Sequence, residues 1–160
     1  MAVDVDGKQV ERLRRYCAMQ DRSVKAWRTK ANDLGLNPED VEKLQLVFVK
    51  DGFLDDNRFA ESYVNAHIRD GRWGPIKLRR GLREQGISKG IVEDVLGRIE
   101  DSIWQENLQS LLDQRPQPQS ENDRARLFRW LRGKGYPADV ILQALDRGHA
   151  RRTFAGHDHD

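Results

Sequence analysis

Apolar residues recur along most of the chain at the three- and four-residue spacing of an amphipathic helix, as Phe59 and Tyr63 illustrate. Strict alternation of apolar and polar residues, the pattern of a half-buried strand, is absent from the sequence. The run LQLVFV at 44–49 is the one stretch that also fits a strand, but Asp51 and Gly52 follow it as a helix stop, so a helix is favoured there. The sequence therefore predicts an all-α protein.

Three segments of the chain come into register when Gly35, Gly86 and Gly135 are aligned. Apolar residues then occupy the positions eight and four before each glycine, and one, six and nine after it. These sets are Trp27, Leu78 and Leu127; Ala31, Leu82 and Leu131; Leu36, Ile87 and Tyr136; Val41, Val92 and Ile141; Leu44, Val95 and Ala144. Each glycine thus lies between two amphipathic helices, where it suits the left-handed backbone that ends many helices. A chance alignment is the alternative, and agreement at five positions favours a true repeat.

A further helical stretch precedes each helix pair, so each repeat is predicted to hold three helices. These stretches lie at about 8–20, 56–70 and 102–114, and the helices after the glycines are expected to begin at Asn37-Pro38, Ser88 and Pro137. The prediction is three tandem three-helix repeats that form an elongated, curved array. The repeats are placed at 8–53, 54–100 and 101–147, with an N-terminal tail at 1–7 and a flexible C-terminal tail at 148–160.

The charge is nearly balanced in total but strongly banded along the chain. Lys and Arg number 28 and Asp and Glu 26, which excludes a uniformly basic protein of the histone kind. Residues 8–30, 67–90 and 124–134 carry net charges of +6, +5 and +5, whereas 37–56 and 91–106 each carry −4. Any binding of a polyanion must therefore come from segregated basic surfaces.

The predicted middle helices of the second and third repeats carry the same basic stripe on the face opposite their apolar residues. The stripes contain no carboxylate, whereas a merely solvated face usually mixes both signs, so an anionic partner is favoured over simple solvation. Trp27 is expected in the core, and Trp73 is expected to be exposed, where it could stack on bases. The candidate partner-binding or DNA-binding residues are Arg72, Trp73, Lys77, Arg80 and Arg83, with Arg126, Arg129 and Arg132 at the repeat-equivalent positions. The first repeat has Ala26, Thr29 and Asn32 in the stripe positions.

The sequence gives no support for catalysis, a metal or a cofactor. The single cysteine, Cys17, excludes an internal disulfide and a Cys-rich zinc site, and is expected to be buried and inert. The terminal run at 157–160, HDHD, offers four potential metal ligands but is interpreted as a solvated tail. No phosphate-cradling glycine loop is present, and the longest nearly apolar run is far shorter than the ~20 residues of a membrane span. We expect a cytoplasmic protein, without a signal peptide, that acts as a monomer by binding.

Two motifs carry a resemblance to a known family. At 51–64 (DGFLDDNRFAESYV) and 72–87 (RWGPIKLRRGLREQGI) the chain resembles the RecX family of bacterial recombination regulators. The family signature Gly-x-Leu-Asp-Asp-x-Arg-Phe-Ala matches Gly52, Leu54, Asp55, Asp56, Arg58, Phe59 and Ala60; its Gly-Pro-x-Lys stretch and later Gly-Ile match Gly74, Pro75, Lys77, Gly86 and Ile87. The likeness covers about 10–147 and weakens toward both ends.

The resemblance implies a fold of tandem three-helix units and a function in DNA recombination, DNA repair and the SOS response. Such a protein would bind the RecA recombinase filament on single-stranded DNA and limit its growth, suppressing strand exchange, ATP turnover and induced repressor cleavage. Some family members also touch DNA, so the basic stripes could face DNA or the filament. A general nucleic-acid-binding module and a helical adaptor for another acidic partner are the alternatives.

The signature residues themselves are expected to be mainly structural. Asp55 or Asp56 is placed to cap the helix that buries Phe59, and Arg58 belongs to the same motif. Pro75 suits a first helical turn and Gly74 the bend before it. Gly81 stands in the middle of a predicted helix, where either another backbone comes close or the residue is merely tolerated.

Overall fold

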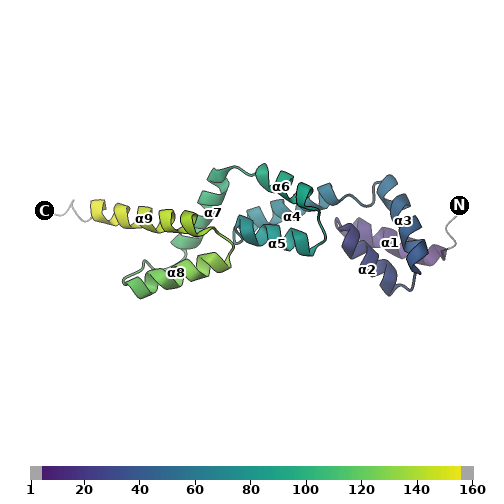
Figure 1. Ribbon diagram of the computed structural model, residues 1–160, viewed down its shortest axis with the longest axis horizontal. Coiled ribbons are helices and arrows are strands. Elements are labelled where there is room, and N and C mark those ends of the chain that lie inside the picture. Colours follow the sequence, from purple (N-terminus) through teal and green to yellow (C-terminus); the bar gives the residue numbers. More distant parts are fainter. Residues whose placement is uncertain (1–4, 156–160) are drawn as a thin grey trace. The chain divides into compact units, whose positions relative to one another are not determined.

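The computed structural model describes residues 5–155, and of residues 150–155 it describes the helical backbone alone. In this part of the chain the regular structure consists of nine α-helices without a strand (Figure 1). The helices are α1 (Gly7–Met19), α2 (Val24–Asp33), α3 (Pro38–Lys50), α4 (Asp56–Asp70), α5 (Pro75–Glu84), α6 (Lys89–Gly97), α7 (Asp101–Asp113), α8 (Glu121–Gly133) and α9 (Ala138–Ala155). The all-α prediction is confirmed, and the ambiguous run at 44–49 lies within α3.

The helices are divided between two compact units. The first unit comprises the residues up to 64 together with 81–95, and the second comprises 65–80 together with the residues from 96 onward. The boundaries fall inside α4, α5 and α6 rather than in loops. The repeat limits inferred from the sequence, and their assembly into an elongated array, stay predictions.

Helices α2, α5 and α8 end in the same glycine turn. The φ angles of Gly35, Gly86 and Gly135 are 88°, 79° and 95°, in the left-handed region that favours glycine. In each turn the N–H that follows the glycine donates to a carbonyl five residues earlier in the chain, which closes the helix as a Schellman motif. The pairs are Leu36 to Ala31 at 3.2 Å, Ile87 to Leu82 at 3.1 Å and Tyr136 to Leu131 at 3.3 Å. The predicted role of the three glycines is confirmed.

The aligned apolar positions form the cores around these turns. All of them are buried except Leu127, which is half-buried and packs against the core of the third helix triplet. Trp27 is fully buried, as expected, and its ring lies 5.2 Å from that of Phe48 on α3. Full burial of one such side chain contributes roughly 1.5–3 kcal/mol, so the aligned residues supply much of the drive to fold. Gly81 is buried within α5.

The helices after the first and third glycine turns begin near the expected positions. Asn37 caps α3, its Oδ1 accepting the Asp40 N–H at 2.8 Å, and Pro38 is the first helical residue. Pro137 immediately precedes α9 instead of opening it, a difference of one position. Helix α9 continues to Ala155, past the predicted end of the third repeat at 147, while the run 157–160 lies outside the described residues.

Two of the glycine turns receive the start of another helix. In the first unit, Lys25 at the start of α2 reaches the turn after α5, where its Nζ donates to the Glu84 carbonyl at 2.8 Å. In the second unit, the Gly74 N–H before α5 donates to the Lys134 carbonyl at 2.6 Å, and the Ile76 N–H donates to the Gly135 carbonyl at 2.9 Å. The contact is close enough that a Cβ on Gly135 would stand 2.5 Å from the Lys77 backbone nitrogen.

We predict that Gly135→Ala destabilises the protein far more than Gly35→Ala. Both changes put a side chain at positive φ, which costs about 1–2 kcal/mol. A Cβ at Gly35 meets nothing within 4 Å, whereas one at Gly135 collides with Lys77, which adds about 1–3 kcal/mol of overpacking. Urea unfolding of the two variants checks the difference, and equal losses would contradict the close contact of α5 with the turn.

Tyr136, which follows the third glycine, places a polar group in the core. Its side chain is fully buried, and within the described residues its hydroxyl has no hydrogen-bond partner. Burial raises the pKa of Tyr136 to about 12, from an ordinary value of 10.0. The ring therefore stabilises the core while the hydroxyl opposes folding.

We predict that Tyr136→Phe raises the free energy of unfolding by about 1 kcal/mol at neutral pH, because an unpaired buried hydroxyl costs about 1–3 kcal/mol. Since the pKa is higher in the folded state, the native protein also loses stability relative to the variant as the pH rises from 10 toward 12. Urea unfolding at pH 7 and above pH 10 measures both effects. A variant less stable than the native protein at pH 7 would reveal a partner for the hydroxyl.

Candidate partner-binding surface

The family-like signature forms the start of α4 and begins with a helix cap. The Asp55 carboxylate accepts the backbone N–H of Arg58 at 3.1 Å, and its carbonyl accepts that of Phe59 at 3.0 Å. Asp55 is thus the N-cap that the sequence predicts, worth about 1 kcal/mol in a typical helix. Phe59 is half-buried, and its ring centre lies 5.7 Å from that of Tyr63.

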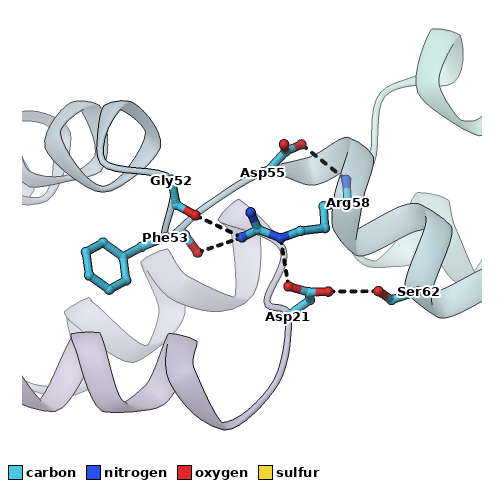
Figure 2. Close-up of polar contacts among 6 residues, drawn as sticks. All are labelled: Asp21, Gly52, Phe53, Asp55, Arg58 and Ser62. Atoms are coloured by element: carbon cyan, nitrogen blue, oxygen red, sulfur yellow. Dashed lines mark hydrogen bonds and ion pairs between the residues drawn. The ribbon is translucent and has the colours of Figure 1, made fainter.

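Arg58 joins the start of α4 to two loops (Figure 2). Its Nε donates to Asp21 Oδ1 at 2.9 Å, and its Nη2 donates to the carbonyls of Gly52 at 3.0 Å and Phe53 at 3.3 Å. The second Asp21 oxygen accepts the Ser62 hydroxyl at 2.7 Å. The hydrogen bond from Ser62, followed by the bond and charge of Arg58, holds the pKa of Asp21 below its ordinary value. One guanidinium therefore fixes the α1–α2 loop and the α3–α4 loop against α4.

Asp56 caps a different helix from the one it belongs to. Its Oδ1 accepts the Val24 N–H, at the first residue of α2, at 2.9 Å. Burial raises the pKa of Asp56, although the bond from Val24 acts in the opposite direction. The sequence suggests Asp55 or Asp56 as a cap of α4 and misses this second role, together with Asp21 and Ser62, because all three contacts join residues more than 30 positions apart.

Gly74 and Pro75 form the second signature element, in the second unit. Pro75 is the first residue of α5, as expected, and Gly74 is buried against the turn after α8. A Cβ on Gly74 would lie 2.6 Å from the carbonyl carbon and oxygen of Gly135. A glycine is required here by the close approach of another backbone, which is a structural role.

The structure brings most of the candidate basic residues into one unit. Arg83 lies in the first unit, and the second unit holds Arg72, Trp73, Lys77, Arg80, Arg126, Arg129 and Arg132. The six arginines are exposed, whereas Lys77 is half-buried. We call the exposed arginines of α5 and α8, namely Arg80, Arg83, Arg126, Arg129 and Arg132, the basic stripes.

Several arginines of the basic stripes keep their charge available. Within the described residues, Arg80, Arg83 and Arg129 form neither an ion pair nor a side-chain hydrogen bond. Arg126 has its nearest carboxylate, that of Asp123, at 3.9 Å. An exposed pair at that distance contributes little stability, so it leaves the charge nearly intact for a partner.

Arg132 and Arg72 are engaged differently. Arg132 Nη1 donates to the Tyr136 carbonyl at 3.3 Å and so helps to close the turn after α8. Arg72 lies 3.6 Å from the Asp70 carboxylate, with both side chains largely exposed. Arg132 thus has a structural contact of its own, while Arg72 pairs only at the surface.

Trp73 is half-buried rather than exposed. Its ring stacks on that of His67 at 4.0 Å and 12°, and Lys77 Nζ lies 4.8 Å from the ring centre. Burial lowers the pKa of His67, which favours the neutral imidazole in this stack. Trp130 on α8 is also half-buried, with the Arg115 guanidinium 4.0 Å from its ring centre. The periodicity of the sequence does not reveal either stack, because His67 and Arg115 come from other elements.

The remaining chemical groups are unremarkable. Cys17 is half-buried instead of buried as expected, and burial raises the pKa of its thiol against the opposing charges of Arg22 and Arg58. Across the described residues no group of three or more His, Cys, Asp or Glu side chains is arranged to hold a metal ion. Over the same residues no helix has the length and apolar character needed to cross a membrane.

Comparison with known proteins identifies the family. Residues 55–96, from the cap of α4 into α6, match the family model described as RecX, second three-helix domain. Regulatory protein RecX of Pseudomonas syringae pv. tomato is 33% identical over 119 residues, covering 72% of this chain and 76% of the relative. The chain belongs to the RecX family. Regulatory protein RecX of Cronobacter sakazakii is 30% identical over 151 residues, covering 86% and 90% of the two chains.

The RecX fold is also found in solved structures. The crystal structure of RecX from Lactobacillus salivarius superposes with a TM-score of 0.75, at 23% identity, and covers 87% of this chain and 95% of that one. A second crystal structure, of regulatory protein RecX, gives a TM-score of 0.77 at 23% identity. At this level of identity the likeness concerns the fold, and it agrees with the all-helical architecture.

We predict that Arg58→Ala lowers the free energy of unfolding by about 1–2 kcal/mol, because it removes one ion pair and two carbonyl contacts of a partly exposed guanidinium. Arg12→Ala, which removes an exposed arginine from α1, should change stability by no more than about 0.5 kcal/mol. Urea unfolding followed by circular dichroism compares the two variants. Equal stability of both would show that the signature arginine does not hold the loops.

Proposed function

We propose that this protein is a negative regulator of homologous recombination that binds the RecA–DNA filament in the cytoplasm and limits its growth and activity. Its membership of the RecX family of regulatory proteins supports a regulatory role. It acts by binding rather than by catalysis. The observation that carries the proposal is the set of exposed arginines, Arg80, Arg83 and Arg129, that no carboxylate of the described chain neutralises.

The chemistry of these arginines suits a nucleoprotein filament. Such a filament presents DNA phosphates and protein carboxylates, and the planar guanidinium donates two parallel hydrogen bonds to either group. A group of exposed arginines without neighbouring carboxylates also attracts an anionic partner over a distance. This electrostatic attraction weakens as salt is added. The basic stripes would therefore contribute to orientation, association rate and specificity more than to raw affinity.

A general nucleic-acid-binding module is the second candidate, favoured by the same arginines together with the half-buried tryptophans Trp73 and Trp130. Such a module binds naked DNA with a steep salt dependence, since each neutralised phosphate releases counterions. A filament regulator instead prefers the filament to bare DNA at the same ionic strength. Measuring both affinities in one buffer separates the two functions.

The decisive experiment adds the protein to RecA assembled on single-stranded DNA and follows ATP hydrolysis and strand exchange. We expect inhibition at substoichiometric amounts, because a protein that limits filament growth acts on many recombinase subunits at once. An absence of inhibition at saturating protein would reject the proposed function.

We predict that the triple change of Arg80, Arg83 and Arg129 to Ala raises the concentration for half-inhibition about tenfold, since three exposed charge contacts of about 0.5 kcal/mol each amount to roughly one power of ten. The triple change of Lys8, Arg12 and Arg147 to Ala removes equal charge from exposed sites outside the basic stripes and serves as the control. Arg132 is left intact because it closes the turn after α8. A similar loss in both triple variants would mean that net charge matters and the location of the arginines does not.

A further inference from the structure

The second unit contains a pocket that neither the signature nor the basic stripes account for. It lies between the α7–α8 loop and α8 and has a volume of about 240 Å³. Arg115 and Pro118 line it from the loop, and Arg126, Leu127 and Trp130 line it from α8. A pocket of this size is below the roughly 300–1,000 Å³ of sites for drug-sized molecules, so it suits one small flat group.

The loop that forms the pocket is peculiar to the third helix triplet. Residues 114–120 link α7 to α8, whereas the corresponding links, at 20–23 and 71–74, are shorter. The loop is held at both ends: the Arg115 N–H donates to the Leu112 carbonyl at 3.1 Å, and the Gln119 N–H donates to Asp123 Oδ2 at 3.0 Å. Two prolines further restrict the backbone between these anchors. The pocket wall is therefore preorganised, which reduces the entropy lost when a ligand binds.

The pocket is lined by two cationic guanidinium groups and by the flat ring of a tryptophan. The Arg115 guanidinium lies 4.0 Å from the centre of the Trp130 ring, so the indole holds it in a cation–π contact. Arg126 stands at the pocket, and its side chain is 72% exposed. The carboxylate in the lining, Asp123, accepts the Gln119 N–H with Oδ2, while its Oδ1 lies 3.9 Å from Arg126 Nη2. The site thus offers a stacking surface, an apolar floor at Leu127 and positive charge for an anion.

We propose that this pocket binds one unstacked base of a single-stranded nucleic acid, with an adjoining phosphate on Arg126. Arginine planes and indoles are the surfaces on which proteins stack exposed bases, with about 1–3 kcal/mol per base. An acidic peptide would use the arginines but would leave the planar Arg115–Trp130 surface without a matching group. A duplex would have to extrude a base before it could be inserted, at a cost of a few kcal/mol. This inference goes beyond the proposed function, because it requires no recombinase.

The test measures binding of a fluorescent oligo(dT) and of a duplex of equal length to the full-length protein, without recombinase, by anisotropy at several salt concentrations. Single strands should bind more tightly than the duplex. Arg115→Ala and Arg115→Lys should both weaken single-strand binding about tenfold, since lysine keeps the charge but lacks the stacking plane. Arg126→Ala should reduce the salt slope by about 0.7, the value for one phosphate of a single strand. Arg147→Ala, on α9 and outside the lining, is the matched control and should stay within about twofold.

Three results would overturn the proposal that the pocket binds a base: no binding of the single strand, equal affinity for the duplex, or Arg115 variants that bind the single strand as tightly as Arg147→Ala does. Circular dichroism and urea unfolding of each variant ensure that a loss of binding is not a loss of fold. Filament inhibition is measured in parallel. Arg115 variants that keep their DNA affinity but lose inhibition also overturn the proposal, since the pocket would then face protein. If the native protein fails to inhibit the filament but its DNA binding depends on Arg115, the pocket proposal is supported and the proposed function is rejected.

Discussion

The left-handed glycine turn after α2, α5 and α8 is the constraint on which the rest of the structure depends. A helix that ended without it would leave its last carbonyls unpaired, at a cost of about 1–3 kcal/mol for each buried one. The Schellman geometry pairs those carbonyls and at the same time turns the chain so that the residue after the glycine enters the core, as Leu36, Ile87 and Tyr136 do. Each turn therefore fixes both the end of one helix and the packing of the next.

The turn at Gly135 also explains why a glycine is needed at position 74, although the backbone there is not in the left-handed region. Gly74 has no left-handed backbone, but it faces the turn at Gly135 so closely that a Cβ would collide with its carbonyl. At the other end of the chain the turn at Gly35 is closed differently, because the Gln9 side chain donates to the Leu34 carbonyl at 2.7 Å. The Leu34 carbonyl is therefore bonded by a side chain of α1, whereas the equivalent carbonyl of the third turn, that of Lys134, is bonded by the Gly74 N–H before α5. The turn at Gly35 is thus completed from within the first helix triplet.

Much of this architecture could be predicted from the sequence, because it depends on local signals. The spacing of the apolar residues and of three glycines was enough to predict the helices, the turns and the burial of the aligned apolar positions. The signature residues indicated the family. The long-range contacts could not be predicted. Nothing near Asp56 in the sequence shows that it caps α2, and the stacking of His67 on Trp73 joins two elements whose approach only the fold determines. For the same reason nothing in the sequence of the α7–α8 loop shows that its Arg115 lies over the Trp130 ring.

The carboxylates and the arginines have different roles in this protein, and this difference links the fold to the proposed activity. Several acidic side chains near helix starts form structural hydrogen bonds: Asp55 caps α4, Asp56 caps α2, and Asp123 holds the loop before α8. A carboxylate bound to N–H donors at a helix start also interacts favourably with the helix dipole. Asp123 makes only a 3.9 Å contact with Arg126, one turn further along α8. Within the described residues Arg80, Arg83 and Arg129 keep their charge without an ion pair, whereas Arg124 on α8 pairs with Asp146 at 2.7 Å. A sequence with the same composition but with its carboxylates among the stripes would retain its net charge of +2, lose several helix caps, and carry no one-signed stripe on α5 or on α8.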